Sequence, residues 1–351
     1  MSKSLPTKIN STADLKKFLQ TALRVEQATI PPYLCALYSI PDGLNREASH
    51  TIHTVVMEEM LHILLVANLI NAIGGKPVVD SPHFPIDYPS PLPGFDHLPK
   101  NEQPYHVGLE KFSPEAMETF LRIELPTYDD PDGSHGPPAT IGQFYDLIRQ
   151  GFHDAYKESK ESLFKGSRKR QVTPEYYYGG SGEVFEVTNM ESAMRAIDEI
   201  VDQGEGHDGS VFSGQSGSKR YSGDEEPAHY YRFNEIYTGR FYQEGDSHDQ
   251  PPSGPVFPVR WDGVYNMHPN PKAEQFKKSS PTRKLMDECN QTYTRLLGAL
   301  DDSFNGNPQN LLEGVRDMYE IKYQAVALMK IPRDDDSGTT AGPAFQYDRP
   351  S

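Results

Sequence analysis

The chain has 351 residues, a length that fits one large domain or two ordinary ones. With 36% hydrophobic and 24% charged residues it is not a disordered protein, and its two cysteines exclude a disulfide scaffold. The formal net charge is −16 at pH 7, because 50 Asp and Glu outnumber 34 Lys and Arg. Phosphate backbones and anionic lipids repel such a surface, so we expect no nucleic-acid or membrane partner.

Two sequence features bear on the compartment. The first residues, 1–11, are polar and lack the apolar core of a signal peptide. The most apolar run, 60–73, is too short to span a bilayer and contains His62. We therefore expect a soluble, cytoplasmic protein that acts on a small-molecule substrate. Self-association into a homo-oligomer is compatible with this expectation.

Two long helices and a short turn are predicted near the start of the chain. The first covers about 12–40, and Pro31 and Pro32 are expected to kink or interrupt it. The second covers about 46–73 and ends at Gly74, a residue type that commonly terminates helices. Helices of this length joined by so short a turn form an antiparallel hairpin.

The middle of the chain predicts a long crossover followed by further helices. Residues 76–112 carry eight prolines and no helical period, yet they are rich in apolar and aromatic residues, which favours an ordered crossover. A helix is expected from Pro114 to about Leu125, and another from Thr140 to about Lys160.

The last predicted elements complete a helical bundle. A strand is considered over 184–187, and a capping-box pattern at Thr188 opens a helix over about 189–205. A further core helix is predicted over about 224–240, and a C-terminal helical hairpin over 281–330. Together with the first two helices, these elements predict a mainly α fold in which 1–351 form a single domain.

A Glu-x-x-His spacing places a carboxylate and an imidazole on one turn of a helix, because residues i and i+3 share a face. A carboxylate-bridged two-metal site in a helical bundle uses two such turns and one further Glu from each of two other helices. The two turns in apolar-rich helical segments are Glu59 to His62 and Glu226 to His229. We predict all four as metal ligands; the competing interpretation is buried polar pairs without a metal.

The partner of the first turn is predicted to be Glu26, on the apolar face of the first helix. Glu26 lies 14 residues before Ile40 at the end of that helix, and Glu59 lies 14 residues after Asn45 at the start of the next. An antiparallel hairpin therefore places both carboxylates at one level. A carboxylate on an apolar face is costly unless it is paired or bound to a metal.

The partner of the second turn is predicted to be Glu205, which ends one core helix where Glu226 begins the next. Glu124, in a short helix near the crossover, is the rival, and His207 is either a further ligand or a loop histidine. Pro227 interrupts the second turn.

Two alternatives concern the segment around this turn. Glu225 could take the ligand role in place of the glutamate that follows it. The Gly- and Ser-rich segment 206–223 is either a lid beside the site or a connector.

Several stretches together resemble one family, the ferritin-like iminophenylpyruvate dimer synthases of bisindole pigment pathways. The stretches are 23–40, 53–77, 140–148, 200–207, 228–237 and, near the end of the sequence, 329–332 with 341–347. The resemblance implies a ferritin-like helical bundle, oxidative chemistry in secondary metabolism, and metal ligands by motif position. These ligands are Glu26, Glu59, His62, Glu205, Glu226 and His229. The chain departs from the family by Pro227 and by being much shorter than the multidomain pigment enzymes.

The expected function is a metal-dependent oxidoreductase or oxygenase that acts on a small aromatic or amino-acid-derived substrate. Two irons are the expected cofactor, with manganese as the alternative. Two other hypotheses compete with this one: a manganese catalase-like peroxide scavenger without an organic substrate, and a non-catalytic metal-binding helical module. No individual catalytic residue is predicted.

Overall fold

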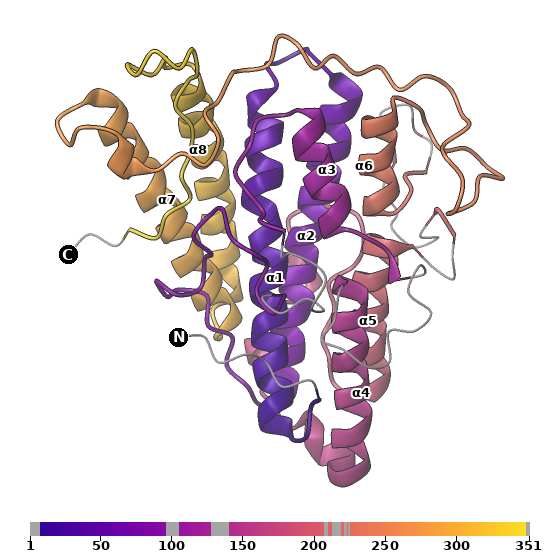
Figure 1. Cartoon of the computed structure of the whole chain (residues 1–351). Helices are drawn as coiled ribbons and strands as arrows, with labels where there is room; N and C mark the ends of the chain where they lie inside the picture. The colour runs from indigo at the N-terminus through magenta and orange to yellow at the C-terminus, as the bar shows by residue number, and fades with distance from the viewer. Residues whose placement is uncertain are drawn as a thin grey trace.

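Two long antiparallel helices, α1 (Thr12–Ser39) and α2 (Arg46–Ala72), form the spine of the molecule (Figure 1). The structure is a computed structural model that describes residues 8–95, 105–127, 140–206, 210–212, 219–220, 223 and 225–348. Both helices lie within one residue of their predicted ranges. The hydroxyl of Ser11 accepts a hydrogen bond from the Asp14 N–H and so caps the start of α1.

Helix α1 continues through Pro31 and Pro32, so the expectation that they interrupt it is wrong. A proline at position 32 has no N–H to donate to the carbonyl of Ala28, four residues earlier. The structure supplies another donor, because the hydroxyl of Tyr88 lies 2.8 Å from that carbonyl oxygen. The crossover thus satisfies the buried carbonyl that the proline leaves free, and the helix needs no break.

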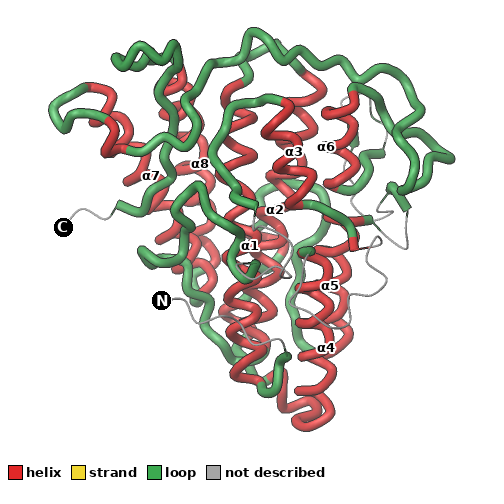
Figure 2. The backbone as a smooth tube through the Cα atoms, in the orientation of Figure 1, coloured by secondary structure: helices red, strands yellow, loops and turns green. Residues whose placement is uncertain are grey.

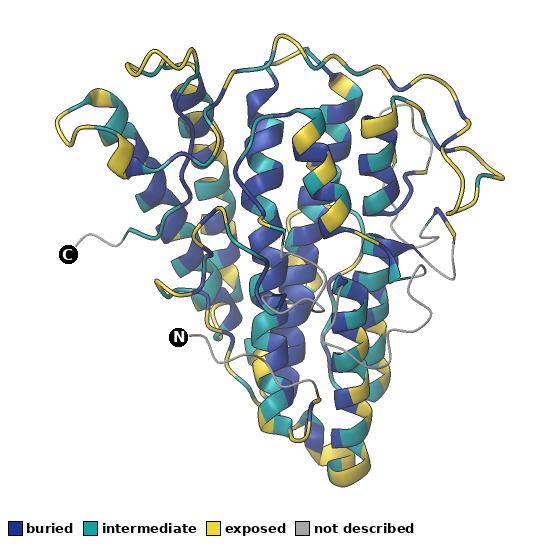
Figure 3. Ribbon diagram, in the orientation of Figure 1, coloured by how far each residue is buried: buried dark blue, intermediate teal, exposed yellow. Residues whose placement is uncertain are grey.

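Helix α2 is the most buried element of the bundle, and every residue from Leu61 to Ala72 is buried (Figure 3). By length and composition it is the one helix in the described part of the chain that could cross a membrane. Its apolar window is 89% buried inside the protein, which is the usual position of a core helix. The helix ends at Ala72, and Gly74, just beyond the cap residue, has a φ of +70° that suits glycine.

Two pairs of shorter helices are stacked end to end along one side of the spine (Figure 1). The upper pair is α3 (Pro114–Ile123) and α6 (His229–Thr238), and the lower pair is α4 (Ile141–Ser159) and α5 (Met190–Glu205). Members of each pair contact each other, and all four contact α1 or α2. Four helix ends therefore meet at mid-height, level with the middle of the spine.

Helix α6 begins at His229, five residues later than the predicted 224. Proline disfavours helical geometry in the residue before it, and Pro227 thus leaves Glu226 in the preceding loop. The start of α5 also differs in detail: Asn189, not Thr188, caps it, in a capping box with Ser192.

The possible strand over 184–187 is not formed; that segment is irregular, and the tube view shows helices and loops throughout the described residues (Figure 2). The crossover is ordered where it is described, with Phe84, Tyr88 and Leu92 buried. The C-terminal hairpin, α7 (Pro281–Phe304) and α8 (Leu311–Met329), packs against the outer side of the spine. The predicted mainly α fold with an added hairpin is confirmed.

The role of the Tyr88 hydroxyl, which donates to the Ala28 carbonyl that Pro32 leaves without a backbone partner, can be tested by removing that hydroxyl. Tyr88→Phe should lower the free energy of unfolding by about 1–3 kcal/mol, because the carbonyl of Ala28 is left buried without a donor. In a Pro32→Ala background the backbone N–H at position 32 can replace the hydroxyl, so the same change should cost less. Urea denaturation of the four proteins measures this difference; an equal cost in both backgrounds would contradict it.

Candidate metal centre

The two long helices bring Glu26, Glu59 and His62 together at one level of the core. Glu59 and His62 lie one turn apart on α2 and share a face. Across the hairpin, Oε2 of Glu26 lies 3.3 Å from Nδ1 of His62, and Oε1 of Glu59 lies 3.8 Å from the same nitrogen. One ligand atom from each residue lies within 4.8 Å of the others. We name these three residues the His62 half of the centre.

The ends of the short helices complete a second group around the same Glu59. Glu124 is the C-terminal cap residue of α3, and His229 is the first residue of α6. Nδ1 of His229 lies 3.1 Å from Oε1 of Glu59 and 3.6 Å from Oε2 of Glu124. Glu59, Glu124 and His229 form the His229 half, again with ligand atoms within 4.8 Å of one another. Oε1 of Glu59 therefore faces both imidazoles.

Each of the three carboxylates uses its second oxygen to accept a hydrogen bond from a hydroxyl group. Thr29 donates to Oε2 of Glu59 at 2.8 Å, and Tyr33 donates to Oε1 of Glu124 at 2.5 Å. Burial and the neighbouring carboxylates raise the pKa of the Tyr33 phenol well above its usual value.

The third donor is the hydroxyl of Tyr145, which binds Oε1 of Glu26. Burial, together with the charge of Glu26, also raises the pKa of this phenol well above its usual value. Both phenols therefore stay protonated, and all three carboxylates turn one oxygen toward the imidazoles.

Like the carboxylates, each of the two histidines has one atom that faces the centre of the group and one that faces away from it. Nδ1 of each ring faces the carboxylates, whereas Nε2 contacts an acceptor outside the group. Nε2 of His62 lies 2.9 Å from Oε1 of Gln203, and Nε2 of His229 lies 2.8 Å from Oε2 of Glu58. Histidines that ligate metals bind an outer acceptor through their second nitrogen in this way.

The charge of the cluster fits bound cations. Glu26, Glu59 and Glu124 are each at most 5% exposed, and within the described residues they form ion pairs only with the two histidines. Burial and the charge of Glu124 raise the pKa of Glu59 to about 7. Nδ1 of His229 is buried and lies 3.1 Å from Oε1 of Glu59, without the alignment of a hydrogen bond. Oxygen and imidazole donors in a dry, negatively charged group suit iron or manganese.

The structure places Glu205 apart from the two halves. Its Oε1 accepts a hydrogen bond from the Gly142 N–H at 2.7 Å, and its Oε2 accepts from the N–H and hydroxyl of Thr127. Gly142 lies in the first turn of α4, where backbone N–H groups lack helical partners. Glu205 thus satisfies the start of α4, while Glu124, ranked second from the sequence, occupies the place beside His229.

Glu226 also lies outside both halves. Because it precedes α6, it does not share a helical turn with His229, and its Oε2 lies 3.4 Å from a guanidinium nitrogen of Arg232. The alternative residue Glu225 is exposed. His207 and most of the segment 206–223 lie outside the described residues.

Glu58 and Gln203 are contacts that sequence reasoning missed. Glu58 is fully buried, and Arg232 binds it through a guanidinium nitrogen 2.8 Å from Oε2. Burial opposes ionisation of Glu58, but the charge of Arg232 and the hydrogen bond from His229 outweigh it and lower its pKa. Two consecutive glutamates on an otherwise apolar stretch of helix do not reveal this role for Glu58, although the burial of an arginine on α6 requires a carboxylate partner.

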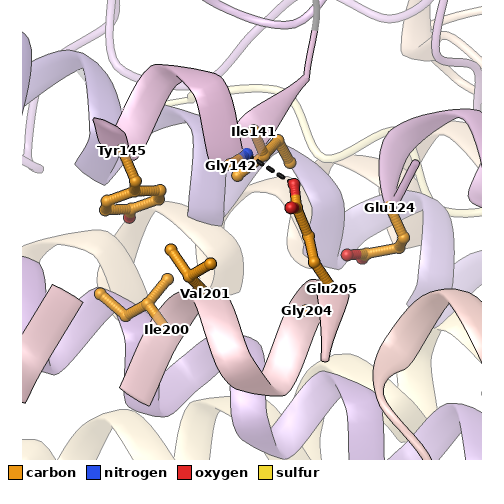
Figure 4. A pocket seen from close by; sticks show the side chains of 8 residues that line it. All are labelled: Glu124, Ile141, Gly142, Tyr145, Ile200, Val201, Gly204 and Glu205. Carbon is orange, nitrogen blue, oxygen red and sulfur yellow. Dashed lines mark hydrogen bonds between the residues drawn. The ribbon is translucent and has the colours of Figure 1, made fainter. Parts of the chain in front are cut away.

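A small pocket adjoins the centre between α4 and α5 (Figure 4). Its cavity has a volume of about 20 Å³, room for about one water molecule, and Glu124 and Tyr145 form part of its wall. Ile200 and Val201 provide apolar surface, and Glu205 reaches in beside Gly142. The pocket therefore has the candidate ligand Glu124 on one side and the apolar side chains of Ile200 and Val201 on the other.

These features define the class of helical bundles with buried carboxylates and histidines in their core. The chain belongs to the ferritin-like family: the sequence model of that family matches residues 19–238. A crystal structure of a ferritin-like protein from Caulobacter vibrioides has the same fold, with a TM-score of 0.62 and 22% identity, covering 94% of this chain and 97% of that one. The ferritin-like resemblance inferred from the sequence is confirmed.

Two curated relatives are much longer than this chain. Dichlorochromopyrrolate synthase of Lentzea aerocolonigenes is 23% identical over 97% of this chain and 36% of its own length. The 2-imino-3-(indol-3-yl)propanoate dimerase of Chromobacterium violaceum is 25% identical over 96% of this chain and 34% of its own length. The chain thus spans about a third of each of these two relatives.

The environment of Glu205 predicts a pH dependence. Burial raises its pKa to about 7 from the ordinary 4.5, despite the hydrogen bonds from Thr127 and Gly142. The folded state therefore keeps a proton that the unfolded chain loses, and stability falls as pH rises from about 4.5 to 7, by roughly 3 kcal/mol in all. In metal-free protein, Glu205→Gln should remove most of this decrease.

Urea denaturation between pH 4.5 and 8, in the presence of a chelator, measures the effect as the difference between the mutant and wild-type curves. Glu191→Gln, at the exposed start of the same helix, is the matched control and should follow the wild-type curve. Parallel curves for Glu205→Gln and wild type would contradict the prediction.

Proposed function

We propose that the chain is a metal-dependent oxidoreductase with a two-metal centre, iron being the expected metal and manganese the alternative. The observation that carries the proposal is the pair of ligand groups that share Glu59, one with Glu26 and His62 and the other with Glu124 and His229. When bound, two such ions would supply Lewis acidity and redox capacity toward dioxygen or peroxide.

The protein groups around the centre would fix its geometry. The hydroxyls of Thr29, Tyr33 and Tyr145 hold one oxygen of each carboxylate, so the other oxygen is available on the inner side. The Nε2–H groups of His62 and His229 donate outward, so a bound cation would take the place of the proton on Nδ1 of each ring. The apolar helices around the group exclude bulk water, which strengthens charge interactions inside.

The substrate class follows from the two curated relatives, whose names specify a chromopyrrolate synthase and a dimerase of an indolyl imino acid. We propose a 2-imino acid with an aromatic side chain, two molecules of which are joined by a new carbon–carbon bond. Forming that bond removes two electrons and two protons from the pair, and one hydrogen peroxide can accept them to give two waters. The small cavity beside Glu124 and Tyr145 indicates the side of α4 and α5 from which a substrate would approach, and it must widen to admit an aromatic imino acid.

The ligand assignment predicts metal contents after reconstitution with iron(II) without oxygen. Wild type should hold two ions per chain. Glu26→Gln and Glu124→Gln should each hold about one, because each removes a ligand from one half only, and Glu59→Gln should hold fewer than either. Mass spectrometry of the desalted proteins measures this.

Glu205→Gln is the control for these metal contents and should match wild type, because Glu205 binds the start of α4. Loss of metal from Glu205→Gln, with full retention by Glu124→Gln, would reverse the assignment of these two carboxylates.

The proposed reaction can be tested with an imine formed in place. L-tryptophan and an L-amino-acid oxidase generate indolyl imine and peroxide, and iron-loaded protein should convert the imine to a product with the mass of two imines minus two hydrogens. Chromatography with mass detection follows it, and Glu59→Gln should form at least about 100-fold less. Rapid oxygen release from peroxide with no dimer would instead support a peroxide scavenger.

A further inference from the structure

The two histidines of the centre have chemically different outer partners. Nε2 of His62 lies 2.9 Å from the neutral amide oxygen of Gln203, whereas Nε2 of His229 lies 2.8 Å from a carboxylate oxygen of Glu58. All four side chains are buried, so bulk water does not level the difference. The two halves are otherwise matched, each with an imidazole Nδ1 and two carboxylates, one of them shared.

The neutral partner is fixed in its orientation by a further contact. The amide nitrogen of Gln203 donates to Oε1 of Glu199 at 3.0 Å, so its amide oxygen is the atom turned to His62. His62 must therefore donate through Nε2, and its Nδ1 is the nitrogen turned toward the carboxylates. The acceptor behind His62 is uncharged.

The charged partner belongs to a buried ion-pair network. Arg232 lies 2.8 Å from Oε2 of Glu58 and 3.4 Å from Oε2 of Glu226, and the hydroxyl of Ser181 also binds Glu58. Arg232 is itself fully buried. A carboxylate paired with an arginine and a hydroxyl is an acceptor only, which again requires His229 to donate through Nε2.

We propose that the two halves of the centre are inequivalent: the His229 half binds a divalent ion more tightly than the His62 half, and Glu58 is the positioning residue responsible. A carboxylate behind an imidazole increases the basicity of the ligating nitrogen and fixes the ring, and loss of such a partner typically weakens metal binding about 10- to 100-fold. An amide oxygen provides the orientation with less basicity. This inference rests on the two-metal centre of the proposed function.

The network also accounts for the buried position of Glu226, which lies near the site without belonging to either half. Arg232 needs negative charge on more than one side to stay buried, because an unbalanced guanidinium in the core is costly. Glu226 supplies that charge from the loop before α6, which leaves Oε2 of Glu58 shared between Arg232 and His229.

Single-half variants with cobalt(II) as the probe test the inference. His62→Ala keeps the His229 half, and His229→Ala keeps the His62 half. Visible absorption titration should give a Kd at least about 10-fold lower for His62→Ala. Adding Glu58→Gln should raise the Kd about 10- to 100-fold in the His62→Ala background and leave it unchanged in the His229→Ala background.

A second pair of substitutions keeps the test independent of the folding of Glu58→Gln. The exchange E199Q/Q203E preserves the net charge and the hydrogen bond between these two positions, and it moves a carboxylate behind His62. In the His229→Ala background this exchange should lower the cobalt(II) Kd about 10-fold. Circular dichroism verifies that each variant is folded.

The outcomes separate this inference from the proposed function. Equal Kd values for the two single-half variants, or no tightening by E199Q/Q203E, would overturn the inequivalence while a wild type that binds two cobalt ions still supports the centre. A wild type that binds no cobalt would overturn the centre itself.

Discussion

The structure depends on holding three carboxylates of like charge close together in a dry core. Glu26, Glu59 and Glu124 are buried within a few ångströms of two imidazoles, and no lysine or arginine pairs with them in the described part of the chain. Hydroxyl donors offset some of the cost of burial, but they bring no positive charge. Cations at this position would remove the remaining repulsion, so metal binding and folding should be coupled.

The bundle meets this constraint by combining two kinds of helix. The continuous helices α1 and α2 fix one side of the centre to within a turn, whereas the other side is built from the ends of shorter helices. Helix ends expose backbone groups and allow side chains to approach from outside the regular helical pattern. Glu124 and His229 reach the same point in this way, and Glu205 instead accepts a hydrogen bond from the start of α4.

The part of the centre on the continuous helices could be predicted from the sequence, and the part on the helix ends could not. The hairpin fixes Glu26 and Glu59 at one level through local spacing alone, so these two and His62 were found together. The neighbours of His229 depend on where α6 begins and on the path of long loops, which no helical period encodes. Pro227 indicates that the helix begins after it, which separates Glu226 from the helical turn of His229. Glu124 could be ranked only by the tertiary position of α3, and Glu58 shows no pattern that separates it from Glu59.

The hydroxyl of Tyr88 that completes the carbonyl of Ala28 has a consequence for engineering. That carbonyl is next to Thr29, which binds Glu59, so the crossover helps to hold the very turn of α1 that supports the cluster. A designer who wished to transplant these ligands into a simpler bundle could not copy the helices alone. The loop would have to be carried with them, or the two prolines exchanged for residues that complete the helix by themselves.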